Sequence, residues 1–203
     1  MIVESPAKAK TIQKYLGDGY TVLPTIGHIR ELPKKDAIDP NNGYSMKYIV
    51  SPGKEDAVKK IKGDAKNAEQ VILATDPDRE GEAIAWHVAD IISNARFEQP
   101  DIKRAIFYEI SEKAVKEAVG NPGEIAMDLV QSQETRRALD RHFGFSLSPL
   151  LWRLFPSNNH SAGRVQSPAL RMIVEREREI EAFVPQEYWT ISAKLEKDGE
   201  YDA

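Results

Sequence analysis

The stretch "VILATDPDREGEAIAWH", residues 71–87, decides the fold of this chain, because an apolar run leads directly into an amphipathic one. The apolar run predicts a strand, and the second half predicts a helix over about residues 80–94. The apolar positions of that helix recur at helical spacing: Ile84, Val88, Ile91 and Ile92. Three acids at alternate positions, Asp76, Asp78 and Glu80, therefore lie between the end of a strand and the first turn of a helix.

Strands and helices alternate on both sides of this stretch as far as residue 120. The first helix has clear limits, because Ser5 is a favoured N-cap, Pro6 suits the first helical position and Gly17 is a common terminator. This alternation predicts an α/β domain with a mostly parallel sheet. We expect strands at residues 2–4, 20–26, 47–50, 70–75 and 104–108, and helices at 6–16, 54–65, 80–94 and 112–120.

The sequence "GNPGE", residues 120–124, is the expected domain boundary. Mostly helix follows it, at residues 125–144, 147–155 and 163–183. The last residues predict a strand, a turn at Asp198-Gly199 and a return strand. The short opening strand and the incomplete hairpin both indicate a piece of something longer.

The composition excludes several classes of protein. The 203 residues contain no Cys, which rules out disulfides and thiolate metal sites, and no apolar run approaches the roughly 18 residues of a membrane span. We therefore expect a cytoplasmic protein. The net charge of -4 argues weakly against nucleic acid, but residues 136–171 contain six arginines, no lysine and one acid. Local charge matters more than the total.

The three acids can be interpreted in two ways. Asp is a favoured N-cap, and acids in a first turn suit the helix dipole, so an ordinary helix start explains them. Open α/β sheets, however, bind ligands at the carboxyl ends of their strands, and crowded carboxylates favour a hard divalent cation. Glu4 ends another apolar strand in the same way, and it faces the three acids if the two strands are neighbours.

Lys8 falls in the first turn of its helix, where a cation opposes the dipole. It is either an exposed lysine at a small cost, or it binds an anion at the helix N-terminus near Glu4. With the acids, the second interpretation predicts a site for magnesium and phosphate.

The arginine-rich half also has two interpretations. Arg137 and Arg141 lie four residues apart on one helical face, which is either solvated or binds phosphate through guanidinium forks. Phe145 and Trp152 either stack on unpaired bases or pack in a core. The segment "HSAGRVQSP", residues 160–168, has small residues that let backbone amides approach a phosphodiester.

The sequence also contains two histidines and one charged run whose surroundings can be predicted. His28, in "GHIREL", is expected on a loop that a ligand can reach, whereas His87 is expected in the core or on a helix surface. The run "EREREIE", residues 175–181, indicates surface ion pairs of little consequence.

These motifs resemble those of the type IA DNA topoisomerases, and most closely the bacterial members. The matching elements follow the order of that family along nearly the whole chain: "VESPAKAKTI" (3–12), "GHIRELP" (27–33), "PGKE" (52–55), "LATDPDREGEAIAWH" (73–87), "RRALDR" (136–141), "SPLLW" (148–152), "SAGRVQS" (161–167) and "VERERE" (174–179). The resemblance implies a Rossmann-like α/β Toprim domain at residues 1–122. It further implies a helical DNA-binding segment at 123–186 and the start of a β arch domain at 187–203.

The resemblance also implies roles for individual residues. Glu4, Asp76, Asp78 and Glu80 match the acidic Mg²⁺ site of the family, and Lys8 matches the lysine that assists cleavage near the scissile phosphate; these five are the expected catalytic residues. The expected DNA-binding residues are His28, Arg136, Arg137, Asp140, Arg141, Phe145, Trp152, Ser161, Ala162, Gly163, Arg164, Val165 and Gln166. Relatives can carry tyrosine where this chain has Phe145, which keeps the stacking surface but lacks the hydroxyl.

The implied activity is relaxation of negatively supercoiled DNA by magnesium-dependent, ATP-independent cleavage, strand passage and religation through a 5′-phosphotyrosyl intermediate. The expected partner is single-stranded DNA, with no membrane and no nucleotide cofactor, and the expected state is a nucleoid-associated monomer in the bacterial cytoplasm. The nucleophile of the family lies in a Tyr-x-Arg-Thr-Asp-like motif, and none of the seven tyrosines has that context. This chain alone is therefore expected to be inactive in relaxation. Two alternatives stay open: another Toprim enzyme such as a primase or nuclease, and a non-catalytic DNA-binding protein.

Overall fold

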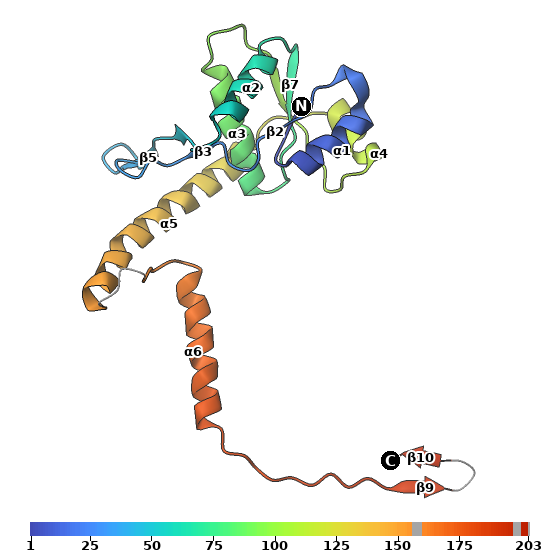
Figure 1. Cartoon of the computed structure of the whole chain (residues 1–203), viewed down its shortest axis with the longest axis vertical. Helices are drawn as coiled ribbons and strands as arrows, with labels where there is room; N and C mark the ends of the chain where they lie inside the picture. Colours follow the sequence, from blue (N-terminus) through green and yellow to red (C-terminus); the bar gives the residue numbers. More distant parts are fainter. Residues whose placement is uncertain (156–159, 197–199, 203) are drawn as a thin grey trace. The chain divides into compact units, whose positions relative to one another are not determined.

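The computed structural model describes residues 1–155, 160–196 and 200–202. The chain forms two compact units, residues 1–142 and 143–203. The first unit is an α/β domain, and the second contains helix followed by a β-hairpin (Figure 1). Within the described residues, no helix combines the length and the apolar composition needed to cross a membrane.

A four-stranded parallel sheet forms the centre of the first unit, in the order β2-β1-β7-β8. Its strands are β1 (Ile2–Val3), β2 (Leu23–Pro24), β7 (Gln70–Leu73) and β8 (Asp101–Arg104). The chain adds β2 on one side of β1, and then adds β7 and β8 on the other side. The strand order therefore reverses between β1 and β7, which makes their carboxyl ends a topological switch point.

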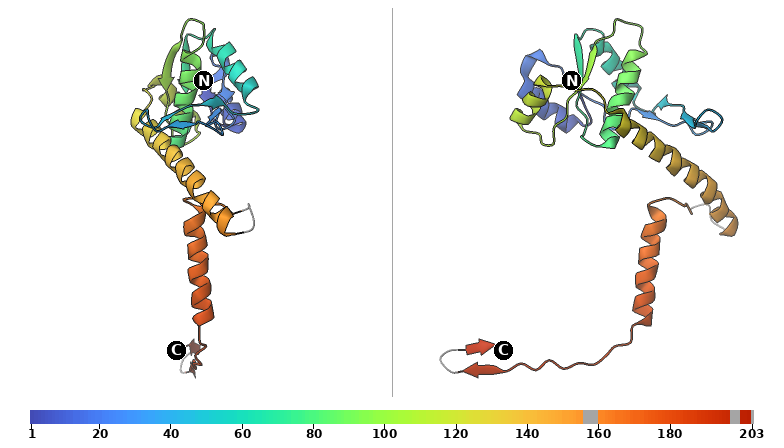
Figure 2. Two further views of the ribbon diagram at one scale, coloured as in Figure 1. Left: turned by 90° about the vertical axis from the view of Figure 1, so that its left-hand side faces the viewer. Right: turned by 180° about the vertical axis from the view of Figure 1, so that it is seen from behind.

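Helices cover both faces of this sheet (Figures 1 and 2). The helices α2 (Glu55–Ala65) and α3 (Arg79–Ser93) pack against the face that carries Ile2 and Leu73. The helices α1 (Pro6–Leu16) and α4 (Glu112–Gly120) pack against the face that carries Val3 and Ile72. Because neighbouring residues of a strand point to opposite faces, these short apolar strands contribute to both cores.

The expected helix limits are largely confirmed in this unit. The Ser5 hydroxyl accepts a hydrogen bond from the Lys8 amide at 3.2 Å, and Gly17 ends α1 with φ of 72°. Ser111 caps α4 in the same way, accepting from the Ala114 amide at 3.2 Å. The sequence thus predicted the segments that lead out of β1 and into α4.

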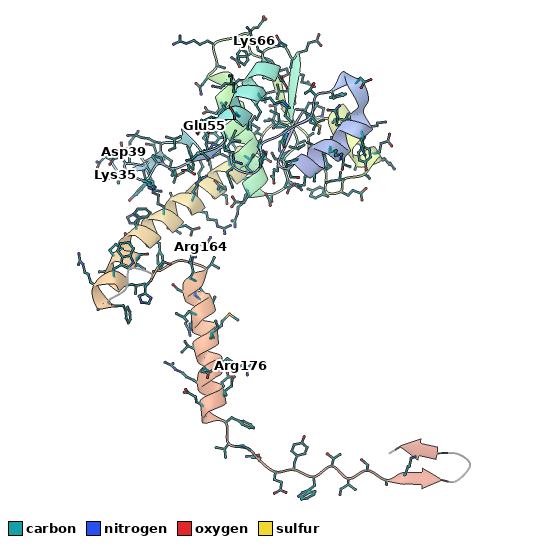
Figure 3. All side chains as sticks on the ribbon, viewed as in Figure 1. Lys35, Asp39, Glu55, Lys66, Arg164 and Arg176 are labelled. Atoms are coloured by element: carbon teal, nitrogen blue, oxygen red, sulfur yellow. The ribbon has the colours of Figure 1, made fainter. Side chains whose placement is uncertain are left out.

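The remaining elements lie outside the sheet. A 3₁₀ turn (Gly17–Gly19) follows α1, β3 (Arg30–Glu31) pairs with β6 (Ile49–Val50), and β4 (Ile38–Asp39) pairs with β5 (Ser45–Met46). The β4–β5 hairpin, where Lys35 and Asp39 are labelled in Figure 3, extends from the body of the unit. The other elements are α5 (Met127–Leu154), α6 (Gln166–Ala182), β9 (Lys194–Glu196) and β10 (Glu200–Asp202).

The prediction of a strand at residues 104–108 was wrong. The strand β8 ends at Arg104, because its partner β7 ends at Leu73 and the two residues are paired. Arg104 then forms an isolated bridge with Gly123, while Ile106 and Tyr108 are exposed. The Ala105 amide still donates to the Leu73 carbonyl at 2.9 Å, but the apolar run beyond Ala105 does not continue the sheet.

The prediction of separate helices at 125–144 and 147–155 was also wrong, since α5 is continuous and contains Pro149. A proline removes one backbone hydrogen bond, but the residues between the two predicted segments keep helical geometry. The last helix begins at Gln166, three residues later than expected, and the strand predicted near the end of the chain is β9, which begins at Lys194. The expected turn at Asp198-Gly199 lies outside the described residues.

A buried ion pair joins the sheet to the helices. Arg104 and Glu82 have side chains that are 0% and 1% exposed, and Arg104 Nε donates to Glu82 Oε2 at 2.9 Å. The same guanidinium donates to the carbonyls of Leu73 at 3.0 Å, Ala105 at 2.6 Å and Asp76 at 2.9 Å. Glu82 accepts from the Ala126 amide at 2.7 Å. The pair thus connects β7, β8, α3 and the residues just before α5.

We expect Arg104→Met and Glu82→Gln each to lower the free energy of unfolding by about 3–5 kcal/mol, because each leaves the other partner charged or unsatisfied in the interior. Urea denaturation measures the loss. The matched control is the exposed pair Lys116–Glu112, at 2.6 Å, where Lys116→Met should cost less than about 1 kcal/mol. Equal small losses at both pairs would contradict a stabilising role for the buried one.

Candidate functional site

Glu4 and Asp76 meet at the switch point of the sheet. Glu4 follows β1 directly, Asp76 lies shortly after β7, and the two strands are neighbours, as the sequence interpretation required. The Asp76 amide donates to Glu4 Oε1 at 3.0 Å. Two carboxyl groups from distant parts of the sequence therefore lie side by side where open α/β sheets bind ligands.

Burial and charge act together on this carboxylate pair. Burial raises the pKa of Glu4, the hydrogen bond from the Asp76 amide opposes that shift, and the nearby Asp76 charge raises the pKa of Glu4 further. The Lys8 ammonium forms an ion pair with Asp76 Oδ1. The first-turn lysine that opposes its helix dipole thus compensates a carboxylate at the strand ends.

Asp78 is the N-cap of α3. Its backbone is extended, with φ of -134° and ψ of 175°, and its Oδ1 accepts from the Gly81 amide at 2.8 Å. Helix capping, the first of the two interpretations of the acids, therefore accounts for one carboxylate oxygen of Asp78.

Gly81 allows the turn before α3 to close tightly. A Cβ atom added there would lie 2.2 Å from the Asp76 carbonyl oxygen, and the Thr75 hydroxyl donates to the Gly81 carbonyl at 2.6 Å. A side chain at this position would have to displace the backbone that carries Asp76.

Glu80 faces α5. Gln133 Nε2 donates to Glu80 Oε2 at 3.1 Å, His28 Nε2 lies 3.6 Å from the same oxygen, and Arg136 Nη1 lies 3.8 Å from Oε1. Of the four predicted metal ligands, Glu4 and Asp76 are thus in contact, while Glu80 is surrounded by groups from the His28 loop and α5. In the part of the chain that is described, no three acidic or histidine side chains are grouped to hold a metal ion.

His28 lies on the loop between β2 and β3, as expected. Burial lowers the pKa of His28, the Arg137 charge lowers it further, and Glu80 opposes both effects. The ring is therefore biased toward its neutral form, which can donate or accept a hydrogen bond.

The arginines of α5 differ in what they contact. Arg136 Nε lies 3.7 Å from Asp140 Oδ2, whereas Arg141 Nη2 donates to the carbonyls of Pro33 at 2.5 Å and Lys34 at 2.8 Å. Arg137 lies against the Tyr48 ring, with its Cζ 5.6 Å from the ring centroid. The sequence pattern placed them on one helix but could not distinguish these surroundings.

A cluster that sequence reasoning missed lies beside Arg137. Arg30 donates from Nε to His87 Nδ1 at 3.1 Å and from Nη1 to Asp90 Oδ2 at 2.5 Å. Tyr48, Trp86 and His87 pack edge-on or tilted around it, with ring centroids 4.4 to 6.1 Å apart. His87 was expected in the core or on a helix surface, and it is fully buried. The sequence shows that Trp86, His87 and Asp90 lie close together on α3. It does not show that Arg30 and Tyr48 contact them, because those two residues come from other segments.

In the second unit, Trp152 Nε1 donates to the His160 carbonyl at 2.7 Å, and the Ala162 amide donates to Ser148 Oγ at 3.2 Å. Phe145 is 65% exposed and Trp152 is 44% exposed, so core packing does not account for either ring in this unit. The segment Ser161–Gln166 leads into α6, where Arg164 is labelled in Figure 3, and an added Cβ at Gly163 would collide with the Gln166 side chain.

Comparison with known proteins identifies the family of this chain. Residues 1–110 match the Toprim domain, and residues 124–203 match the DNA topoisomerase family. This chain belongs to the type IA DNA topoisomerase family. It is 55% identical over 196 residues to DNA topoisomerase 1 of Xylella fastidiosa and 54% identical over 198 residues to that of Rickettsia bellii.

Each of these alignments covers 96% of this chain but only 24% or 25% of the relative, so the chain spans about a quarter of their length. The solved structure of full-length topoisomerase I from Thermotoga maritima is similar with a TM-score of 0.79 and 48% identity, covering 91% of this chain and 31% of that one. The Thermotoga maritima protein therefore has the same fold as this chain over most of the chain's length.

His87 generates a pH prediction for this member of the family. Burial, and then the charges of Arg30 and Arg137, lower the pKa of His87 to about 3 from 6.5. Between these values the unfolded chain binds a proton that the folded chain does not, so the free energy of unfolding falls as pH falls through that window. We expect His87→Asn to lose less stability than the unsubstituted chain between about pH 7.5 and pH 4.5. Urea denaturation at both pH values measures this difference.

The control is His142→Asn, because His142 is exposed on α5. Its pH dependence should match that of the unsubstituted chain. Parallel losses in the His87 variant would contradict a neutral, buried His87.

Proposed function

We propose that this chain is the N-terminal part of an enzyme that relaxes negatively supercoiled DNA by cleaving one strand, passing DNA through the break and resealing it. The reaction would need magnesium but not ATP, and would proceed through a 5′-phosphotyrosyl bond. The observation that carries the proposal is the pairing of Glu4 with Asp76 at the switch point, with Lys8 bound to Asp76. A primase or nuclease would share the acids, but the match of residues 124–203 to DNA topoisomerases favours this reaction.

The donor groups fit a magnesium ion. Mg²⁺ commonly takes one or two carboxylates and fills its other positions with water and substrate phosphate. Adjacent Glu4 and Asp76 supply two carboxylates. Burial raises the pKa of Glu4 and the Asp76 charge raises it further, so a cation beside the pair would offset part of that cost. We propose that Asp76 and Asp78 hold the ion, that Glu80 supports it, and that Glu4 lies within reach of it. Bound there, magnesium would offset negative charge on a phosphate.

The side chains have separate roles in this proposal. Burial raises the pKa of Glu4, which suits a group that gives or takes a proton at the sugar oxygen of the cleaved bond. Lys8 would stabilise phosphate charge, at the cost of its present pairing with Asp76. The DNA strand would contact His28, Arg136, Arg137, Asp140 and Arg141 in the first unit, and Phe145, Trp152 and residues 161–166 in the second. We further propose action as a monomer in the bacterial cytoplasm, without a nucleotide cofactor.

The metal proposal predicts a ligand-dependent stability. Magnesium at a hundredfold excess over Kd should raise the free energy of unfolding by about 2.7 kcal/mol, because it binds only the folded chain. The double variant Glu4→Gln with Asp76→Asn should lose most of that gain. Thermal denaturation with and without magnesium measures both.

Asp18→Asn is the control, since Asp18 is an exposed acid outside the site. It should keep the full gain. An equal gain in the double variant would move the magnesium site elsewhere.

The DNA proposal predicts salt-sensitive binding of single strands. Arg136→Ala and Arg137→Ala should each lower the affinity and flatten the slope of log K against log salt by about 0.7, the contribution of one phosphate contact. Fluorescence anisotropy with a labelled oligonucleotide at several salt concentrations gives the slope. Arg176→Ala, at a residue 74% exposed and paired with Glu179 at 2.7 Å, should leave the slope unchanged.

If all three variants behave alike, the DNA path over α5 is misplaced. The same preparations should not relax supercoiled plasmid, because none of the seven tyrosines has the family's neighbouring residues. Resealed topoisomers together with a covalent protein–DNA adduct would overturn that part of the proposal.

A further inference from the structure

Two guanidinium groups lie against the ring of Tyr48. The Cζ atom of Arg30 lies 5.3 Å from the ring centroid, and that of Arg137 lies 5.6 Å from it. Both distances fall within the range in which a cation is attracted to an aromatic ring. Tyr48 immediately precedes β6, whereas Arg137 lies on α5, so the contact joins two distant segments.

The Tyr48 ring is itself held from two helices. It packs edge-on against His87 at 4.4 Å and Trp86 at 6.1 Å, both on α3. Its hydroxyl donates to Glu134 Oε1 at 3.3 Å, one helical turn before Arg137 on α5. Burial raises the pKa of Tyr48 to about 12, so the hydroxyl keeps its proton. The ring is therefore a fixed surface rather than a mobile one.

Arg137 is incompletely satisfied by the protein. Its Nη2 lies 3.5 Å from the Arg30 carbonyl, and its Nη1 is buried without a hydrogen-bond partner among the described residues. Its charge acts on His28, which lies 3.6 Å from Glu80. A half-buried guanidinium that is held on one side by a ring, with one long hydrogen bond to the protein, keeps hydrogen-bonding capacity for an external acceptor such as a phosphate or base oxygen.

We propose that Tyr48 is a positioning residue for DNA binding, and that it acts only through Arg137. The ring restricts a side chain that otherwise has many rotamers, so the guanidinium is already oriented when a strand arrives. The inference rests on the proposed contact of Arg137 with DNA. It adds to the site a residue that need not touch the strand.

A double-mutant cycle tests the inference. Affinity for a labelled single strand is measured for the unsubstituted chain, Tyr48→Leu, Arg137→Ala and the double variant, and thermal denaturation of each reports folding separately. We expect Tyr48→Leu to lower affinity by roughly tenfold, the size of a partly desolvated cation–π contact, and to have no further effect in the Arg137→Ala background. Tyr48→Phe keeps the ring and should bind as the unsubstituted chain does. The control Tyr108→Leu, at a residue 88% exposed, should also bind normally.

Three results would overturn the inference. Arg137→Ala could weaken binding while Tyr48→Leu does not, which leaves the DNA proposal intact. Tyr48→Leu could weaken binding equally in both backgrounds, which would mean that it acts independently of Arg137. Binding that survives Arg137→Ala would remove the DNA contact itself, and the inference with it. If Tyr48→Leu does not fold, Tyr48→Met fills a similar volume without an aromatic ring and takes its place in the cycle.

Discussion

The ion pair between Arg104 and Glu82 holds the backbone on which both the acidic residues and the arginines of α5 depend. Two charges without exposed surface are costly unless their remaining hydrogen-bonding positions are satisfied. Here Arg104 satisfies carbonyls at the end of β7 and at Asp76, and Glu82 satisfies the Ala126 amide. The backbone that carries the acids and the segment that leads into α5 are therefore held by the same two side chains. A shift in either would leave polar groups unpaired in the interior.

Close packing adds a second constraint to the same backbone. Gly81 lies so near Asp76 that no side chain fits, and Asp78 caps α3 through the Gly81 amide. These two contacts fix the turn, which leaves the Asp76 backbone little freedom to move away from Glu4. Because the two carboxyl groups cannot separate, a cation beside them reduces their repulsion. Lys8 supplies that charge from α1, so the electrostatics of the site follow from the geometry of a turn.

Local patterns predicted most of the fold, while contacts between distant segments explain what was missed. The helix limits at Ser5, Gly17 and Ser111 and the stripe of α3 follow from capping and periodicity, which act over a few residues. Arg104 and Glu82 look like ordinary surface charges in the sequence, because their burial depends on a sheet and a helix meeting. The resemblance to type IA topoisomerases assigned Glu4 and Asp76, and strand adjacency explains their contact. Neither the local sequence patterns nor the family resemblance identified Tyr48, because what distinguishes this residue is its position in space between Arg30 and Arg137.

The arginines of α5 illustrate why charge alone does not define a nucleic-acid surface. Arg141 satisfies two loop carbonyls, Arg136 lies between Glu80 and Asp140, and Arg137 rests on an aromatic ring. A phosphate that approaches Arg136 would compete with the carboxylates of Glu80 and Asp140. Among the described residues no carboxylate forms an ion pair with Arg137, so a phosphate there would meet no such competitor. The affinity of an arginine for phosphate depends on what it must release as well as on its charge. On that reasoning, Arg137 is the arginine of α5 best prepared to bind a DNA strand, because it lies against the uncharged ring of Tyr48.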